Sequence, residues 1–317
     1  MKHIIINDYG VFLGLHSQRL SIKKDKQIIK EVALNRIKTI QILSKGVSLS
    51  SDLILACANR GIKIFINSFN SFSVLHTMYE HKSVIVRENQ INLDNVKRLE
   101  LARKFIIGKI KNQRATLLYL SRNINNEKKD NVIKFFDENI LKLKNKKLEK
   151  FDFILGIEGS CANQYFKYLK EMRFFASSFE YRTKRYSEEI TNIALNYGYA
   201  ILENFIYKSC INAGLEPYKG VLHSTRSAKP SLVLDIMEEY RSFVVDRNVI
   251  KLRSKLEKNN FDKIKRELAT NILKTLTKKY KYNHKKITLE SIIQRQVYKL
   301  SGYFSGNNNY KSYIFRW

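Results

Sequence analysis

The pattern of apolar and polar positions changes character once along the chain, near residue 82. Before that point, short runs rich in β-branched residues are separated by polar or glycine breaks, which is typical of strands. The segment 48–60 instead has apolar residues at helical spacing, with Ser50 or Ser51 able to cap its start and Gly61 to end it. The other runs predict strands at 2–7, 11–15, 20–23, 27–32, 36–43, 62–67 and 73–78. A small sheet that holds one helix fits this region best.

Beyond residue 95 the apolar positions recur at helical spacing, and the breaks between segments are mostly rich in Asn and Lys. Helices are expected at 96–121, 131–143, 151–172, 187–213, 230–245, 261–280 and 289–303. We therefore predict an α+β protein. Its parts are a small N-terminal β-rich domain (1–81), a linker (82–95) and a larger all-α domain (96–317).

The charge balance indicates a class of ligand. Lys and Arg number 58 against 29 Asp and Glu, which gives a formal net charge of +29. Such a field attracts phosphate polymers or anionic membranes and carries no information about fold. Richness in Lys, Asn and Ile is also typical of AT-rich coding sequence, but 12% aromatic residues and many Arg accompany the Lys. We therefore favour nucleic acid as the partner.

Cysteine usage and hydropathy indicate the compartment. Cys57, Cys161 and Cys210 lie far apart in apolar surroundings and form no CxxC pair. Buried free thiols in a reducing compartment are the simplest interpretation. The N-terminus, MKHIIINDYG, lacks the apolar segment of a signal peptide, and no apolar run approaches about 18 residues. A soluble cytoplasmic protein that does not associate with membranes is expected.

Common catalytic signatures are missing from the sequence. It has no GxxxxGK(S/T), GxGxxG, HExxH or GxSxG motif, so ATP-driven, dinucleotide-dependent and serine-hydrolase chemistry have no support. His76 and His81 lie near the predicted domain junction, and we interpret them as structural or surface residues.

An acidic cluster follows a histidine in the second half of the chain. His223 lies in a polar loop, and Asp235 is three residues before Glu238 and four before Glu239, so one helical face can present two carboxylates. The flanking residues are apolar, and buried carboxylates without partners are costly, so a divalent cation is an economical partner. The alternative is that Glu238 and Glu239 pair with Arg241 on a solvated face.

A further carboxylate, Glu158, lies between Gly156 and Gly159 in an otherwise apolar predicted helix. Each glycine costs a helix up to about 1 kcal/mol relative to alanine, so the pair needs a reason. With Ala162, the glycines form a face of small residues that would let another backbone or a DNA strand approach. The alternative is a helix start with Glu158 as an ordinary first-turn acid.

Four segments, taken together, carry a resemblance. In chain order they are LGIEGSCANQYF, NIALNYGYAILENF, GLEPYKGVLH and PSLVLDIMEEYRSFVVDR. They match the motifs E-G-x-x-A-x-x-Y-F, N-x-x-L-x-x-G-Y-x-x-L, G-x-x-P-x-x-G-x-x-H and D-L-M-E-x-F-R, although DIMEEYR replaces the more common DLMEPFR. The set resembles the CRISPR adaptation integrase family, the larger subunit of the complex that inserts new spacers. The match spans the chain, including a β domain before a helical catalytic domain.

The resemblance implies roles for the acids and the histidine. Glu158, His223 and Glu238 would be the metal ligands, and Asp235 a nearby catalytic acid that organises or binds the metal. Two carboxylates and an imidazole suit Mn²⁺ or Mg²⁺, with the nitrogen ligand favouring Mn²⁺. Attack on a phosphodiester by a DNA 3′-OH would give strand transfer, and attack by water would give endonuclease activity. Tyr165 matches the motif tyrosine.

The resemblance also implies partners. These are DNA, as a prespacer duplex and a CRISPR leader–repeat, a small ferredoxin-like adaptation protein, and a second copy of the chain in a homodimer formed largely through the β domains. Basic residues of the helix at 96–121 would hold phosphates without reading sequence. They are Lys97, Arg98, Arg103, Lys104, Lys109, Lys111 and Arg114. Two alternatives remain: a transposon integrase of the same fold, and a non-catalytic DNA-binding scaffold with structural acids.

Overall fold

The computed structural model describes the chain except for residues 1, 68–71, 76–80, 145–149, 184–186, 225–228, 259 and 307–308, and except for the side chains of residues 2, 67, 72, 81 and 82. His76 is therefore outside the described residues, and only the backbone of His81 is described. The chain forms two compact units, Met1–Val84 and Ile85–Trp317. Among the described helices, none has the length and apolar character needed to span a bilayer.

The N-terminal unit contains strands from two four-stranded sheets. The strands are β1 (Lys2–Ile6), β2 (Phe12–His16), β3 (Arg19–Lys24), β4 (Gln27–Ala33), β5 (Ile37–Ile42), β6 (Ser48–Leu49), β7 (Lys63–Asn67) and β8 (Phe72–Leu75). One sheet has the order β1-β5-β7-β8, with the first three strands parallel and β8 antiparallel to β7. The other has the order β4-β3-β2-β6, antiparallel except for the β2–β6 pair.

The single helix predicted in this unit is present as α1 (Ser51–Asn59), and a 3₁₀ turn, η1, covers Leu34–Arg36. Ser50 accepts a hydrogen bond from the backbone N–H of Leu53 at 3.2 Å, and Gly61 follows the helix with φ +65°. The prediction of one small sheet is wrong, because the described strands form two sheets around one apolar core. Alternating apolar residues determine which side chains face a core, but they do not determine which strands pair.

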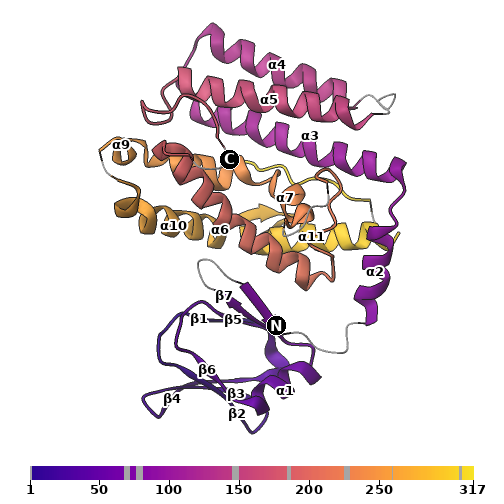
Figure 1. Ribbon diagram of the computed structural model, residues 1–317, viewed down its shortest axis with the longest axis vertical. Coiled ribbons are helices and arrows are strands. Elements are labelled where there is room, and N and C mark those ends of the chain that lie inside the picture. The colour runs from indigo at the N-terminus through magenta and orange to yellow at the C-terminus, as the bar shows by residue number, and fades with distance from the viewer. Residues whose placement is uncertain are drawn as a thin grey trace. The chain divides into compact units, whose positions relative to one another are not determined.

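The second unit is mainly helical (Figure 1). Its helices are α2 (His81–Ile91), α3 (Asn95–Leu120), α4 (Glu127–Lys144), α5 (Phe151–Glu171), α6 (Ile190–Asn212), α7 (Ser231–Met237), α8 (Arg247–Lys251), α9 (Arg253–Leu256), α10 (Phe261–Thr277) and α11 (Leu289–Phe304). α3, α4 and α5 pack side by side, and α6 packs against α7, α10 and α11. The region expected as a linker, 82–95, contains most of α2. A β-rich region followed by a helical domain confirms the predicted fold class.

One β-hairpin interrupts the helices. The helix expected at 261–280 stops at Thr277, and β9 (Lys279–Tyr282) pairs antiparallel with β10 (Lys285–Thr288). Asn283 and His284 have φ of +44° and +64°. Positive φ at both central residues is the conformation of the tight turn that matches the twist of a two-stranded hairpin, and Asn tolerates it well. The backbone already leaves the helical conformation at Lys278, whose φ and ψ of −64° and 141° are extended.

The helix expected at 230–245 is also broken. After α7, the backbone N–H groups of Glu238, Glu239 and Tyr240 each donate to the carbonyl three residues earlier, which tightens the chain. A π-helical turn, η2 (Ser242–Asp246), then leads into α8. Neighbouring side chains in this stretch therefore leave the backbone in directions that a regular helix would not give.

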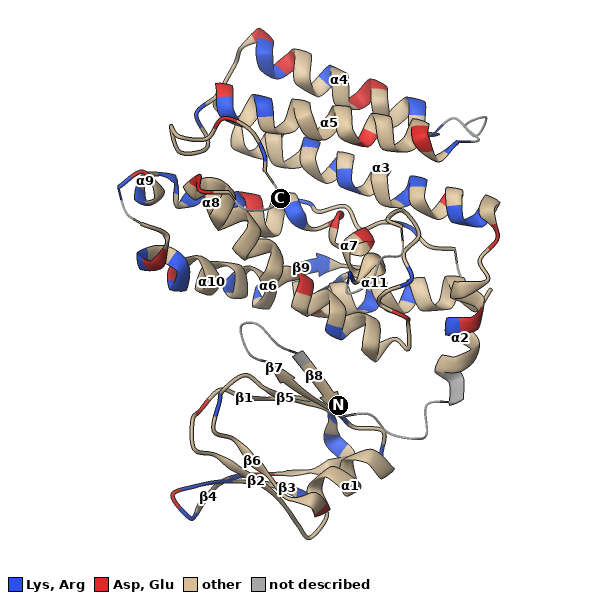
Figure 2. Cartoon of the chain, viewed as in Figure 1, with Lys and Arg blue, Asp and Glu red and all other residues tan. Residues whose placement is uncertain are grey.

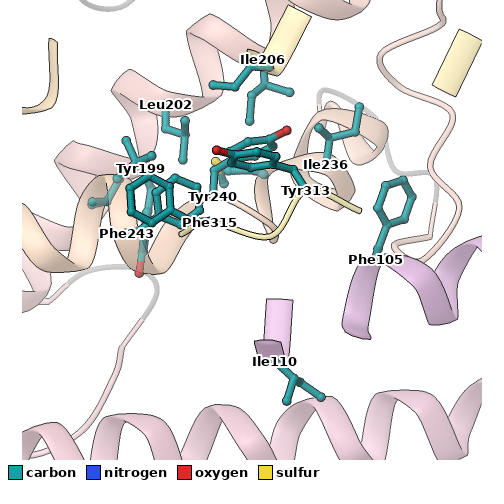
Figure 3. Packing of buried hydrophobic residues seen from close by; sticks show 14 of the residues in the cluster. Phe105, Ile110, Tyr199, Leu202, Ile206, Ile236, Tyr240, Phe243, Tyr313 and Phe315 are labelled. Atoms are coloured by element: carbon teal, nitrogen blue, oxygen red, sulfur yellow. The ribbon is translucent and has the colours of Figure 1, made fainter. Parts of the chain in front are cut away.

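The core of the helical unit lies around α6, η2 and the C-terminal segment 309–317 (Figure 3). Phe243 of η2 stacks on Phe315, with ring centroids 4.3 Å apart. The buried carboxamide of Asn112 donates to the carbonyl of Tyr313 at 2.8 Å and accepts from the N–H of Phe315 at 2.9 Å. The Asn112 side chain thus hydrogen-bonds to backbone groups of the non-helical C-terminal segment and holds that segment against α3.

Candidate metal centre

A pocket of about 690 Å³ opens in the helical unit, lined by residues of α3, α5, α6 and the stretch from α7 to η2. Three of the four predicted site residues, Glu158, His223 and Glu238, line this pocket. The fourth, Asp235, is fully buried beside it. Residues from positions 158 to 238 thus meet in one place, although they come from separate segments.

His223 is oriented by Asp235. Its Nδ1 lies 2.5 Å from Asp235 Oδ1, and the same carboxylate accepts from the backbone N–H groups of Val221, Leu222 and His223 at 2.6, 3.0 and 3.0 Å. Because a carboxylate that receives three N–H bonds acts as an acceptor, we assign the ring proton to Nδ1. The other ring nitrogen, Nε2, then keeps its lone pair for a ligand. Asp235 supports the histidine in the way that carboxylates support metal-bound histidines.

The loop that carries His223 is held from several sides. Gln90 of α2 donates to the carbonyls of Glu216 and Lys219 at 2.9 and 2.8 Å, and Arg98 of α3 donates to the carbonyl of Val221 at 2.9 Å. A Cβ on Gly220 would lie 2.6 Å from the carbonyl oxygen of His223 and 3.1 Å from Asp235 Oδ2. Only glycine lets the loop fold this tightly over the carboxylate, which explains the glycine three residues before the histidine.

Lys109 of α3 joins the two remaining acids. Its ammonium bonds to Glu158 Oε1 and lies 2.8 Å from Glu238 Oε2. The Lys109 side chain is 9% exposed and that of Glu238 is 5% exposed. Burial works against the charge on Lys109, but Glu238 and Glu158 together raise its pKa. The pair of carboxylates is therefore bridged by a buried positive charge.

Glu238 is ionised at neutral pH. Burial opposes its charge, but Arg241, whose Nη2 lies 3.3 Å from Oε1, and then Lys109 lower the pKa of Glu238 to about 2. The alternative, in which Glu238 and Glu239 pair with Arg241 on a solvated face, holds only for the Glu238–Arg241 pair. Glu238 is buried and Arg241 is 23% exposed, and both line the pocket.

Glu239 is directed away from the pocket. Its carboxylate accepts from the Tyr310 hydroxyl at 2.6 Å and from the backbone N–H of Tyr313 at 2.8 Å. Burial raises the pKa of Glu239 to about 7, against the effect of these donors. The three acids after His223 thus have three different neighbours, which the spacing on a regular helix could not reveal.

The donor set fits a divalent cation. Two carboxylates and one imidazole nitrogen are a common combination for Mn²⁺ and are accepted by Mg²⁺. The buried Lys109 ammonium already lies between the carboxylates, which shows that this part of the pocket is built to surround positive charge. Within the described residues, no three His, Cys, Asp or Glu side chains yet converge closely enough to hold a metal. The residues that would hold it are Glu158, Glu238 and His223, with Lys109 displaced.

Several pocket residues were missed by the sequence reasoning. Asp246 of η2 accepts from the Tyr199 hydroxyl at 2.5 Å, and burial raises the pKa of Asp246 to about 6. The guanidinium groups of Arg182 and Arg241 lie 5.3 and 4.9 Å from the ring centroid of Tyr199. The sequence did indicate a special position for Lys109, because this lysine lies among apolar residues at helical spacing, namely Phe105, Ile106 and Ile110, which are buried. A lysine in such a stripe needs a buried acid.

The basic residues predicted to bind phosphates on α3 are largely engaged within the protein. Lys97 pairs with Asp94 at 3.3 Å, Lys104 with Glu100 at 2.7 Å, and Arg114 with Asp137 at 2.8 Å. Lys167, Lys170 and Arg182 line the pocket itself, where Lys170 pairs with Glu180 and Arg182 donates to the side chains of Asn192 and Asn196. Figure 2 shows Lys and Arg distributed over most helices of the unit, mixed with acids, rather than concentrated on α3.

Comparison with known proteins identifies the family. A family model described as CRISPR associated protein Cas1 matches residues 4–282. A CRISPR-associated endonuclease Cas1 from Francisella tularensis subsp. novicida (strain U112) is 47% identical over 323 residues, which cover 100% of both chains.

Two solved structures share the fold. A casposase bound to its integration product has a TM-score of 0.70 at 23% identity and covers 100% of this chain and 95% of its own. A chain of a partial Cas6-RT-Cas1–Cas2 complex has a TM-score of 0.76 at 19% identity, with 99% of each chain covered. Fold, motifs and full-length sequence identity agree. The chain belongs to the CRISPR-associated Cas1 family.

Proposed function

We propose that this chain is a metal-dependent DNA endonuclease and integrase of CRISPR adaptation, which inserts new spacers into a CRISPR array. The observation that carries the proposal is the meeting of Glu158, His223 and Glu238 at one pocket in a chain of this family. Lys109 and Arg241 already surround these acids with positive charge, and a buried carboxylate with a strongly lowered pKa beside a pocket, as at Glu238, is typical of a functional site.

The chain's own residues prepare the pocket for DNA. A divalent cation, when bound, supplies Lewis-acid polarisation of a phosphodiester. Asp235 keeps His223 in the tautomer that presents Nε2, and Arg241 keeps Glu238 ionised. Lys167, Lys170 and Arg182 bring positive charge to the pocket lining, where they would position phosphates once Lys170 exchanges its partner Glu180 for a phosphate. We favour Mn²⁺ over Mg²⁺, because one of the proposed ligands is a nitrogen.

The proposed reaction conserves phosphodiester bonds. The 3′ oxygen of an incoming DNA end bonds to a target phosphorus, and the bond from that phosphorus to the target strand's 3′ oxygen breaks. The proton leaves the attacking hydroxyl and ends on the released one. No energy source is required, which agrees with the missing phosphate-binding loop in the sequence. With water as attacker, the same pocket would cut DNA.

The proposed assembly includes a second copy of the chain and a small Cas2-type adaptation partner of ferredoxin-like fold. Chains of Cas6-RT-Cas1–Cas2 complexes share this fold, which supports the Cas2-type partner. The N-terminal unit offers support for the dimer. β4 lies at the edge of its sheet, with Ile28 54% and Ile29 57% exposed. An edge strand with adjacent exposed isoleucines favours burial against another chain.

The dimer can be tested by light scattering after size-exclusion chromatography. Ile29→Glu is expected to give a monomer, whereas Leu55→Glu, at an exposed position of α1 in the same unit, is expected to stay dimeric. A dimeric Ile29→Glu protein would show that β4 is not the interface.

The activity is tested by strand transfer of a labelled duplex into a supercoiled plasmid with a leader and repeat. The reaction contains the Cas2-type partner and Mn²⁺ or Mg²⁺. Joined product is expected from the wild type and from Asp152→Ala, an exposed acid on the same helix as Glu158, but not from Glu158→Ala or His223→Ala. Equal DNA binding without joining by all four proteins would support the non-catalytic scaffold instead.

A transposon integrase is the second candidate. The casposase that shares this fold along the whole chain favours it. The plasmid assay separates the two, since a CRISPR integrase requires the leader–repeat and the Cas2-type partner. Efficient insertion that needs neither would support the transposon function.

A further inference from the structure

Lys109 occupies an unusual place for a lysine. It extends from the buried face of α3, next to the fully buried Ile110, and its side chain is 9% exposed. Burying an ammonium is costly unless acids surround it. The acids are Glu158 from α5 and Glu238 from the segment after α7, so one cation ties three parts of the chain together.

The ammonium lies where the proposed metal would have to bind. It contacts Glu158 Oε1 and Glu238 Oε2, which are oxygens of both proposed carboxylate ligands. A lysine ammonium and a divalent cation cannot share these oxygens at bonding distance, because like charges repel strongly in a poorly solvated pocket. Either the ammonium moves or the metal does not bind.

The side chain has a direction in which to move. Lys109 also lines the pocket of about 690 Å³, so the residue borders open space next to the carboxylates that it holds. A lysine ends in a compact charge on a flexible four-carbon stem, which can change rotamer while the helix backbone stays in place.

We propose that Lys109 is a built-in cation of the metal-free site, which holds Glu158 and Glu238 together until a divalent cation displaces it. This inference rests on the proposed function, because it takes both acids as metal ligands. Lys109 then has two opposing effects on the site. Lys109 keeps the two carboxylates from repelling each other in the empty site, and it weakens metal binding because it must be displaced.

The test compares Lys109→Met with the wild type by Mn²⁺ titration under electron paramagnetic resonance and by thermal unfolding. Lys109→Met is expected to bind Mn²⁺ about tenfold more tightly, since no cation competes. Without metal its melting temperature should fall, and Mn²⁺ should raise it more than in the wild type. Lys109→Arg retains the charge and should melt near the wild-type temperature without metal.

Lys208→Met is the matched control. Lys208 is 5% exposed and lies 3.4 Å from the carboxylate of Glu290, but it does not line the pocket. This variant should lower the melting temperature without changing Mn²⁺ affinity. Glu158→Gln should abolish Mn²⁺ binding.

A second measurement uses the wild-type protein only, so it does not depend on the folding of a variant. Lysine acylation by an N-hydroxysuccinimide ester, mapped by mass spectrometry, should be slow at Lys109 without metal and severalfold faster with Mn²⁺. Lys208 should react equally in both conditions. Unchanged protection of Lys109 at saturating Mn²⁺ would overturn the displacement.

The outcomes separate the two proposals. If Lys109→Met binds Mn²⁺ no more tightly than the wild type while Glu158→Gln abolishes binding, the metal site stands and the role of Lys109 is wrong. If neither the wild type nor Lys109→Met binds Mn²⁺, the metal-dependent function and the inference both fail.

Discussion

Gly159→Ala tests whether the small-residue face of α5 is kept open for DNA. Gly159 is an exposed position inside α5, and an added Cβ would meet nothing within 4 Å. Replacing glycine by alanine in a helix interior stabilises it by about 0.5–1 kcal/mol. For a unit of this size, the melting temperature should rise by roughly 1–4 °C. DNA affinity and strand transfer should fall, because the new methyl group projects beside the pocket that Gly159 lines.

Gly108→Ala is the control for helix propensity. Gly108 is also inside a helix, α3, but its added Cβ would lie 2.5 Å from Ser312 Cβ and 3.3 Å from Glu239 Cγ. The segment around Ser312 would have to shift, so this variant should melt below the wild type.

The assays are thermal unfolding by circular dichroism, fluorescence anisotropy with a labelled duplex, and the plasmid strand-transfer reaction. A lower melting temperature for Gly159→Ala would refute the argument from open space. A more stable variant with wild-type DNA affinity and joining would show that DNA does not approach α5 here.

Three further predictions concern buried polar groups. The Asp235 carboxylate accepts from His223 and from three backbone N–H groups, and Asp235→Asn leaves only one acceptor oxygen for them. The affinity for Mn²⁺, measured by titration, should therefore fall about 10- to 100-fold. An unchanged affinity would exclude an orienting role for Asp235. Burial raises the pKa of Asp246 from 3.8 to about 6, so the folded state holds this proton more tightly and loses up to about 3 kcal/mol of stability as pH rises through that range. The difference in unfolding free energy between wild type and Asp246→Asn, measured in urea from pH 4 to 7, should shrink accordingly, and a constant difference would contradict the shift. Asn112→Ala leaves the carbonyls of Glu239 and Tyr313 and the N–H of Phe315 without this partner, so the free energy of unfolding measured in denaturant should fall by about 3 kcal/mol or more. A decrease below about 1 kcal/mol would show that other contacts anchor the 309–317 segment.

Much of the fold followed from periodicity. The strands and most helices appear within a few residues of their predicted positions, because a buried face repeats every two residues in a strand and every three to four in a helix. The pairing of strands into two sheets did not follow, since a strand with one apolar face can pair with any other. The β9–β10 hairpin was missed because its turn consists of Asn283 and His284 rather than a glycine.

The candidate site was predicted only in part. Glu158, His223 and Glu238 line one pocket as expected, and the structure adds that Asp235 contacts His223. Lys109 was assigned to DNA phosphates, because sequence shows its charge but not the two acids around it. The distribution of Asp235, Glu238 and Glu239 over three environments depends on the tightened turn after α7, which no helical spacing rule predicts.

The C-terminal segment gives the chain an order of assembly during synthesis. Asn112 and Tyr313, which bond to each other, are 201 positions apart. Until residues 310–315 have been translated, α3 lacks its cover, and Glu239, next to Glu238, lacks the donors of Tyr310 and Tyr313. The N-terminal unit needs only residues up to about 84 and can fold first. A nascent chain therefore lacks the contacts that cover α3 and satisfy the Glu239 carboxylate until residues 310–315 have been made.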